Sequence, residues 1–254
     1  MRVALLGPEG TYTHQAAKKY FGDFEPEYCS TIREVFKSEV ETKFVPVENS
    51  LGGGVSDTID LLRDTQDRIT AEVVLSINHA LISESKREDI ENIKSHPQAL
   101  AQSQEIISEN NWQEIETDST AKAVEEIEEG EAALASEIAS EINDVPIIEK
   151  AVQDSDNNIT RFFVLNGEPE PEEKASIILE PGEDRPGLLH SMLSCFSGHQ
   201  VNLSHIQSRP TKQGLGEYFF YVEAEAGGEK LDKAVQCLET YADVKILGRY
   251  SRVE

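Results

Sequence analysis

The sequence predicts an α/β protein with a larger first part of two lobes and a smaller second part of βαββαβ order. Three observations lead to this prediction. Up to about residue 165, short apolar runs typical of strands alternate with segments whose apolar residues recur at helical spacing. Long extended stretches near residues 70–82 and 150–165 predict two crossings between two lobes. A Pro/Glu-rich gap at residues 168–174 then precedes a new folding pattern.

The elements of the first part follow from local sequence. Residues 2–6 form an apolar strand that enters a turn, and Thr31 and Glu34 form a capping box that opens a helix. Residues 97–108 read as a single helix, and Ser119 is expected to cap the next one. The same periodicities predict strands at 43–47, 69–82, 90–94, 114–116 and 132–135, and helices around 16–21, 55–62 and 138–142. This alternation predicts a mostly parallel sheet with helices on both faces.

The second part begins near Ala175. Its expected strands cover 175–180, 201–208, 217–224 and 244–250, and its expected helices cover 187–197 and 231–241. The order βαββαβ is that of the ferredoxin-like arrangement. We therefore expect a first domain at 1–167, with lobes of about 1–75 plus 150–167 and of 76–149, a linker at 168–174, and a second domain at 175–254.

Charge and composition exclude several classes of partner. The 254 residues include 48 acids and 23 bases, a formal charge of −25, so the basic footprint that nucleic acid or an anionic membrane requires is missing. No segment approaches the roughly 20 apolar residues that span a bilayer, and the N-terminal apolar run is too short for a signal peptide. We expect a cytoplasmic protein. The acids are spread along the chain, which favours adaptation to a salty cytosol over an ordinary acidic protein.

Several chemical templates do not fit the sequence. Cys29, Cys195 and Cys237 are odd in number and widely spaced, which predicts reduced thiols. The six histidines are not at ligand spacing and no HExxH or paired CxxC occurs, so no metal site is expected. No GxGxxG or GxxxxGK[ST] is present. A Ser-His-Asp triad stays open on residue counts, although it lacks the GxSxG elbow.

Five polar segments fall at junctions between strands and helices of the first domain, at residues 7–13, 47–50, 95–98, 118–120 and 158–161. In open α/β sheets, ligands bind beyond the carboxyl ends of strands, and helix N-termini favour anions. Singly, Thr13, Ser95 and Ser119 read as helix caps. Together, the five junctions predict one cleft that holds a small anionic molecule through hydroxyls, amides and one arginine.

These segments resemble the motifs of prephenate dehydratases that carry a C-terminal ACT domain, a regulatory module that senses amino acids. The matching runs are Gly-Pro-Glu-Gly-Thr-Tyr at 7–12, Val-Pro-Val-Glu-Asn-Ser at 45–50, Ser-His-Pro-Gln-Ala-Leu-Ala-Gln at 95–102, Asp-Ser-Thr-Ala at 118–121, Ala-Ala-Leu-Ala-Ser at 132–136 and the signature Thr-Arg-Phe at 160–162. The resemblance covers nearly the whole chain. It implies a two-lobed, periplasmic-binding-protein-like catalytic domain that converts prephenate to phenylpyruvate, water and CO₂ in phenylalanine biosynthesis. It also implies no cofactor, and a homodimer or homotetramer.

The resemblance also implies site residues. Thr160 is expected to contact the departing ring hydroxyl, Glu48 to act as an acid or an orienting carboxylate, and Arg161 to anchor a substrate carboxylate or buttress its loop. The expected substrate-binding residues are Thr11, Asn49, Ser50, Ser95, His96, Gln98, Ser119, Thr120 and Phe162, with Phe162 at the cleft floor.

In the second domain, residues 185–189 resemble the family's Gly-Ala-Leu element and residues 207–210 its Glu-Ser-Arg-Pro element, with Leu188 in place of Ala and Gln207 in place of Glu. The implied phenylalanine-binding residues are Gly187, Leu188, Leu189, Asn202, Leu203, Gln207, Ser208, Arg209 and Pro210. A dimerisation module without a ligand is the alternative for this domain. For the whole chain, the alternatives are an arogenate dehydratase, a non-catalytic solute-binding protein and a pure amino-acid sensor.

Overall fold

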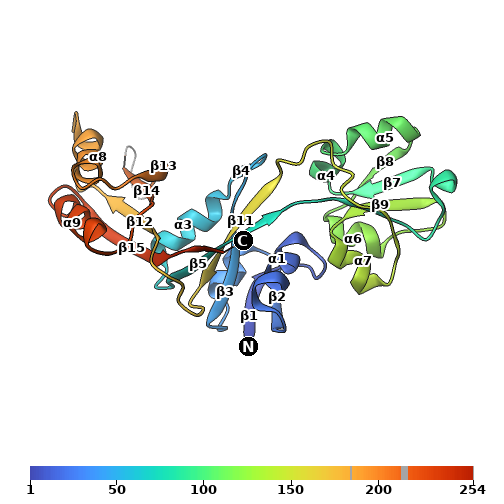
Figure 1. Cartoon of the computed structure of the whole chain (residues 1–254), viewed down its shortest axis with the longest axis horizontal. Coiled ribbons are helices and arrows are strands. Elements are labelled where there is room, and N and C mark those ends of the chain that lie inside the picture. Colours follow the sequence, from blue (N-terminus) through green and yellow to red (C-terminus); the bar gives the residue numbers. More distant parts are fainter. Residues whose placement is uncertain (184, 213–216, 254) are drawn as a thin grey trace. The chain divides into compact units, whose positions relative to one another are not determined.

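The computed structural model describes residues 1–183, 185–212 and 217–253, and contacts divide the chain into two compact units (Figure 1). Unit 1 comprises Met1–Val55 and Val74–Phe162, and unit 2 comprises Ser56–Val73 and the chain from Phe163 onward. Residues 56–73 thus group with the later part of the chain. The domain boundaries expected from the sequence differ from these units and remain a prediction.

One sheet of unit 1 contains β1 (Arg2–Leu6), which pairs in parallel with the strand on each side of it. β1 pairs with β2 (Glu25–Cys29) and β3 (Thr42–Asn49), and the short β4 (Gly53–Gly54) pairs antiparallel with β3. β11 (Ile159–Leu165) begins beside β3. The sequence pattern does not predict β2, because Glu and Pro residues occupy three of its five positions and hide the apolar periodicity.

Side chains cap the two helices that accompany this sheet, α1 (Tyr12–Phe21) and α2 (Ile32–Lys37). Thr11 Oγ1 accepts a hydrogen bond from the His14 N–H (3.3 Å). Thr31 Oγ1 accepts from the Glu34 N–H (3.2 Å), and the Glu34 carboxylate accepts in return from the Ser30 N–H (2.9 Å). The capping box at Thr31 is therefore confirmed, with its reciprocal bond one residue earlier than the usual pattern.

The second sheet of unit 1 has the strand order β10-β6-β9-β7-β8. β7 pairs in parallel with β8 and β9, whereas β6 pairs antiparallel with β9 and β10. The strands are β6 (Ala80–Ile82), β7 (Asn92–Ser95), β8 (Gln113–Glu116), β9 (Glu131–Ala135) and β10 (Ile147–Glu149). The helices are the 3₁₀ turn η1 (Arg87–Asp89), α4 (Pro97–Ala101), α5 (Gln104–Asn110), α6 (Thr120–Glu125) and α7 (Glu137–Asn143).

Helices cover both faces of this sheet, with α4 and α5 on one side and α6 and α7 on the other (Figure 1). The central strand β9 is buried along its whole length. Ala132 and Leu134 join the core beneath α4 and α5, while Ala133 and Ala135 join the core beneath α6 and α7. Small residues on this strand let helices pack closely on both faces.

The prediction of a single helix over 97–108 is wrong, because the helix breaks at Gln102 and Ser103. The Ser103 backbone is non-helical (φ −136°, ψ 32°), and the Gln102 N–H closes α4 on Ala99 and Leu100 carbonyls. No Gly or Pro marks this break in the sequence. It leaves the Gln102 side chain at the end of α4 instead of within a helix.

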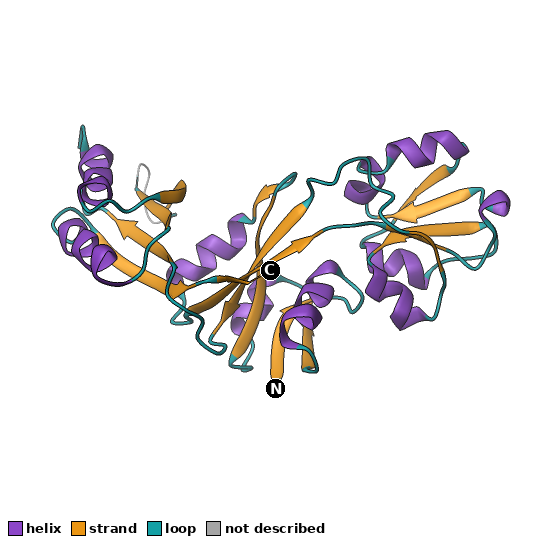
Figure 2. Ribbon diagram, viewed as in Figure 1, coloured by secondary structure: helices purple, strands orange, loops and turns teal. Residues whose placement is uncertain are grey.

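Unit 2 has the predicted βαββαβ order, with sheet order β13-β14-β12-β15 (Figure 2). Its elements are β12 (Lys174–Glu180), α8 (Leu188–Gly198), β13 (Leu203–Pro210), β14 (Tyr218–Ala224), α9 (Gly228–Leu238) and β15 (Asp243–Tyr250). α8 and α9 bury Leu188, Met192, Phe196, Leu231 and Leu238 in one core with the sheet. The unit also holds α3 (Ser56–Asp64), the start of β5 (Ile69–Ser76) beside β15, and β16 (Arg252–Val253).

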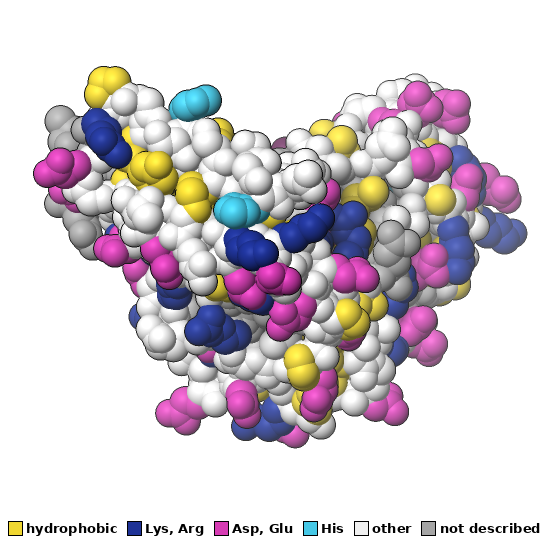
Figure 3. Space-filling view, turned by 60° about the vertical axis from the view of Figure 1, so that its left-hand side comes forward, with side chains coloured by type: hydrophobic (Ala, Val, Ile, Leu, Met, Phe, Trp, Pro, Cys, Tyr) yellow, Lys and Arg dark blue, Asp and Glu magenta, His cyan; other side chains and the backbone are white. Residues whose placement is uncertain are grey.

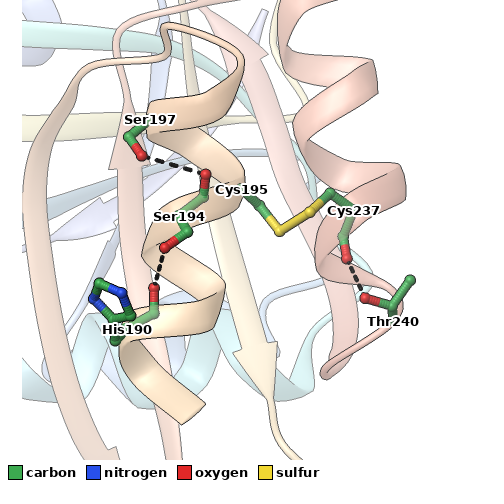
Figure 4. The surroundings of a disulfide bond; sticks show 6 residues. All are labelled: His190, Ser194, Cys195, Ser197, Cys237 and Thr240. Atoms are coloured by element: carbon green, nitrogen blue, oxygen red, sulfur yellow. Dashed lines mark hydrogen bonds between the residues drawn. A yellow bond between two sulfur atoms is a disulfide. The ribbon is translucent and has the colours of Figure 1, made fainter. Parts of the chain in front are cut away.

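A disulfide joins α8 to α9 (Figure 4). Cys195 and Cys237 have Cα atoms 5.6 Å apart and are bonded through sulfur, while Cys29 is free. The prediction of reduced thiols is therefore wrong for this pair. The sequence separation of 42 between the two cysteines conceals that their helices pack side by side on one face of a sheet.

Acidic side chains are scattered over the surface, interleaved with lysines and arginines on the face that Figure 3 presents. Because the acids are dispersed, the charge of −25 acts as a diffuse negative field and not as a local anionic patch. Among the helices that the structure describes, none combines the length and apolarity needed to cross a membrane.

Candidate active site

A cavity of about 460 Å³ lies within unit 1, and each of the five polar segments contributes to its wall. Eight residues predicted for the site line it: Thr11, Asn49, His96, Gln98, Ser119, Thr120, Thr160 and Phe162. The Phe162 ring is buried and stacks on Phe44, with ring centroids 4.9 Å apart. The cavity therefore has an aromatic floor beneath a polar rim.

Four other predicted residues are not among those that line the cavity. The hydroxyl of Ser95 is buried and donates to the Leu134 carbonyl (2.6 Å). The Ser50 hydroxyl donates to the Asn157 carbonyl (2.6 Å) and accepts from the Ile159 N–H (2.9 Å). These two serines hold the backbone around the cavity.

Glu48 and Arg161 form an ion pair on the neighbouring strands β3 and β11. Arg161 Nη1 lies 2.6 Å from Glu48 Oε2, and the two side chains are 15% and 33% exposed. Each residue directly precedes or follows a cavity residue in the chain, Asn49 and Thr160 respectively. The pair thus sits behind the cavity wall, where it links the two strands that carry these polar groups.

The Asn49 amide determines how Thr160 can use its hydroxyl. Asn49 Oδ1 accepts from the backbone N–H groups of Leu51 (3.1 Å) and Gly52 (2.8 Å), which fixes the orientation of the amide. Asn49 Nδ2 then donates to Thr160 Oγ1 (2.9 Å) and to Asn158 Oδ1 (2.8 Å). Because Thr160 Oγ1 accepts from Asn49, its own proton can be directed into the cavity.

The cavity is nearly free of fixed charge. No lysine or arginine is among the described residues that line it. Its carboxylate, Asp118, is bonded to Lys122 (2.7 Å), which lowers the pKa of Asp118. A ligand here meets neutral donors, namely hydroxyls, side-chain amides and backbone N–H groups.

Sequence reasoning missed several cavity residues, including Tyr12, His79, Gln102 and Asn158. Tyr12 and Gln102 lie within runs that resemble family motifs, but the sequence does not show which way they face. His79 falls within residues 69–82, which the sequence predicts as extended, but in the structure it lies in the gap between β5 and β6. Its side chain is 2% exposed, and burial lowers its pKa, while burial raises the pKa of Tyr12.

Gly52 also shapes the cavity. A Cβ atom at this position would lie 3.3 Å from Asn49 Oδ1 and 3.4 Å from Gln98 Nε2. The first distance is tighter than ordinary van der Waals contact and the second is at its lower limit, so a side chain here would press on the Asn49 amide. The glycine run at 52–54, which reads only as a flexible loop in the sequence, is part of the wall.

A second cavity, of about 570 Å³, lies in unit 2. Gly187, Leu188, Leu189 and Ser208 line it, as predicted for an effector site, whereas Asn202, Leu203, Gln207, Arg209 and Pro210 are not among its lining residues. Arg209 instead pairs with Asp60 on α3 (2.7 Å) and donates to the Ser56 hydroxyl (2.8 Å). Arg185 and Glu180 add charged groups that sequence reasoning did not select.

Comparison with known proteins agrees with this architecture. The family described as prephenate dehydratase matches residues 3–170, and the ACT domain matches residues 182–240. A prephenate dehydratase from Methanocaldococcus jannaschii is 37% identical, with 96% of this chain and 95% of that protein covered. Among solved structures, the prephenate dehydratase from Arthrobacter aurescens in complex with L-Phe is similar at 29% identity and a TM-score of 0.87, covering 99% of this chain and 90% of that one.

A structure titled as GqqA, a novel type of quorum quenching acylase, is also similar, at 25% identity and a TM-score of 0.90, covering 100% of this chain and 98% of that one. The same fold is therefore also associated with acylase activity in another protein. The family match, the full-length relative and the two cavities agree with one another, and they show that this chain belongs to the prephenate dehydratase family and carries an ACT domain.

Proposed function

We propose that the cavity of unit 1 is where prephenate loses water and CO₂, with Thr160 as the hydrogen-bond donor to the departing ring hydroxyl. The observation that carries the proposal is the fixed Asn49 amide, which occupies the Thr160 oxygen and leaves its proton for a ligand. The reaction makes the ring aromatic, so the chemistry runs downhill. The protein needs to orient the substrate and help the hydroxyl leave.

In this elimination the electrons come from the substrate itself, so the protein needs only to help the hydroxide leave as water. The bond between the ring and the carboxylate breaks, and its electron pair enters the ring as the hydroxyl departs from the opposite carbon. The leaving hydroxide becomes water by taking a proton. The pKa of a threonine hydroxyl is too high for full transfer, so Thr160 acts as a strong donor and the proton arrives through water.

Neutral donors suit the carboxylate that leaves as CO₂. A close cation would stabilise that carboxylate in the ground state and raise the barrier to its loss. Gln98, Ser119 and Thr120 can bind its oxygens without a fixed charge. Glu48 and Arg161 serve as a paired buttress behind Asn49 and Thr160.

The test is an absorbance assay for phenylpyruvate with purified protein and prephenate, repeated with arogenate. We expect turnover of prephenate at a higher kcat/KM than arogenate, which carries an ammonium group in place of the keto group. Absence of phenylpyruvate from a folded protein, as judged by circular dichroism, would overturn the proposal.

Acyl transfer, the chemistry of an acylase such as the structural relative GqqA, is not favoured by the cavity. It requires a nucleophile activated by a base within hydrogen-bond reach. Among the described cavity hydroxyls, Thr11 and Ser119 accept helix-capping bonds and Thr160 accepts from Asn49. Only Tyr12 bonds to an imidazole there, and burial keeps its hydroxyl protonated.

For regulation, the cavity of unit 2 is proposed as the phenylalanine site. Leu189 is 39% exposed at this cavity and offers an apolar surface to the effector ring. We expect Leu189→Ala to weaken phenylalanine binding by about tenfold in calorimetry. Ile206→Ala is the matched control, since Ile206 is 44% exposed in the same unit and is not among the lining residues. Equal losses in both variants would contradict the assignment.

The remaining features proposed for this chain are the domain boundaries 1–167 and 175–254 with a linker at 168–174, a homodimer or homotetramer, and a cytoplasmic location. The acidic composition and the resemblance support these proposals. Sedimentation equilibrium measures the oligomer, and a monomer at micromolar concentration would contradict it.

A further inference from the structure

His79 is a buried ionisable group at a cavity that lacks a fixed cation. It is 2% exposed, lies between β5 and β6, and its ring lines the cavity. The backbone around it is fixed, because its N–H donates to Gln153 Oε1 (2.9 Å) and its carbonyl accepts from the Val152 N–H (2.9 Å). The position of the imidazole is therefore well defined.

The tautomer of His79 follows from a chain of amides. Asn158 Oδ1 accepts from the fixed Asn49 amide, so Asn158 Nδ2 must face Gln102, where it donates to Oε1 (2.8 Å). The same Gln102 oxygen lies 3.0 Å from His79 Nε2. An amide oxygen carries no proton, so His79 Nε2 must be the N–H that donates to it.

The other ring nitrogen can carry a proton or a lone pair without any movement of heavy atoms. His79 Nδ1 lies 2.5 Å from Tyr12 Oη, and Tyr12 Oη lies 3.2 Å from the Asn78 carbonyl oxygen. When the imidazole is neutral, the Tyr12 hydroxyl donates to Nδ1. When it is protonated, Nδ1–H donates to Tyr12 Oη, and the hydroxyl turns to donate to Asn78.

Every partner of the imidazolium is thus already an acceptor. Of the two described residues that bond to the ring, Tyr12 is titratable and Gln102 is neutral. The groups bonded to the His79 backbone, from Gln153 and Val152, and the Asn78 carbonyl near Tyr12 are also neutral. Burial lowers the pKa of His79, so the free protein holds it neutral near pH 7. A bound anion would reverse the balance, because an opposite charge nearby favours the protonated form.

We propose that His79 takes up a proton when the anionic substrate binds and thereby supplies a positive charge to the carboxylate that the product keeps, only while the ligand is present. This inference rests on the proposed function, since it concerns the substrate of the same cavity. The proton comes from solvent and returns to it on product release, so the charge balance closes over one turnover.

The experiment is calorimetric binding of prephenate at pH 6.5 to the Thr160→Val variant, which suppresses turnover. Titrations in two buffers of different ionisation enthalpy give the number of protons taken up. We expect uptake of between about 0.3 and 1 proton, and affinity that falls by up to tenfold per pH unit as the pH rises between the free and bound pKa values of His79.

Two further variants test the assignment, both in the Thr160→Val background. Adding His79→Gln retains a donor toward Gln102 but cannot gain a charge, so proton uptake should vanish and the affinity should no longer vary with pH. His14→Asn is the matched control, because His14 is also buried (7% exposed) with a pKa lowered by burial, yet is not among the cavity residues. It should leave proton uptake unchanged.

The outcomes separate this inference from the proposed function. Prephenate that binds without proton uptake, or uptake that survives in the His79→Gln variant, overturns the role of His79 alone. Prephenate that fails to bind, together with no phenylpyruvate from the wild type, overturns the proposed function.

Discussion

Replacement of Thr160 by Val removes one hydroxyl and keeps the branched shape of the side chain. Two bonds are lost, the one proposed to the departing hydroxyl and the one accepted from Asn49 Nδ2 (2.9 Å). A positioned donor contributes about 10²–10⁴-fold to the rate, which corresponds to about 3–5 kcal/mol in the barrier. We expect kcat to fall by this factor, with KM changed by less than about threefold, because the loss falls mainly on the transition state.

The stability cost should be smaller, and this separates the two effects. Asn49 Nδ2 keeps its bond to Asn158 Oδ1 (2.8 Å) and loses one partner in a half-buried setting, worth about 1 kcal/mol or a few degrees in Tm. Steady-state assays at 25 °C and thermal unfolding measure the two quantities. Thr160→Ser, which keeps the hydroxyl, is the control and should retain kcat within about tenfold. A folded Thr160→Val enzyme with kcat within tenfold of wild type would refute the reasoning.

Four further predictions follow from charge, burial and crosslinking. Arg161→Met should lower Tm by a few degrees while kcat falls less than tenfold, because the ion pair lies behind the cavity. A loss of kcat as large as that of Thr160→Val would instead make Arg161 a substrate anchor. The Cys195–Cys237 disulfide closes a loop of about 42 residues, so its reduction should destabilise unit 2 by about 4 kcal/mol. Denaturant titrations with and without reductant measure this difference, and coincident unfolding curves would contradict it. Burial lowers the folded-state pKa of His14 and His79, so the unfolded chain binds protons more readily than the folded chain. The free energy of unfolding should therefore be highest above about pH 6.5 and fall by up to about 1.4 kcal/mol per pH unit for each histidine as the pH drops below that value. The His14→Asn variant should show a shallower slope. Raising the salt concentration from 0.1 to 1 M shortens the Debye length from about 10 to about 3 Å and so screens the repulsion that arises from the charge of −25. Both Tm and kcat/KM for the dianionic substrate should therefore increase with salt. If neither quantity changes with salt, the hypothesis of salt adaptation is wrong.

The sequence predicted the elements whose periodicity is local. The capping box at Thr31 and the βαββαβ order of the second part depend on spacing over a few residues, and both occur in the structure. β2 and the break between α4 and α5 were not predictable in this way. Tertiary contacts decide them, since β2 gains its bonds from β1, and Ser103 at the break is fully buried.

Prediction of the site was limited by side-chain direction. Ser50 and Ser95 lie in motifs at the ends of strands near the cavity, as predicted. Their hydroxyls, however, donate to the backbone carbonyls of Asn157 and Leu134. Conversely, His79 reaches the cavity from a gap in the extended stretch predicted for residues 69–82, and Gln102 does so because the helix ends there. The spacing of residues in the sequence predicts where a helix or strand ends. The direction in which a side chain points there depends on the packing around it.

The scarcity of fixed charge in the cavity bears on competition from inorganic ions. Chloride, sulfate and phosphate bind proteins chiefly where lysine, arginine or a metal holds a permanent positive charge, and none of the described lining residues is a lysine or arginine. A small spherical or tetrahedral anion cannot satisfy hydroxyls and amides spread around a space of about 460 Å³. The cavity would therefore stay available to its organic substrate in a medium rich in salt, where a site built on cations would be occupied by the medium itself.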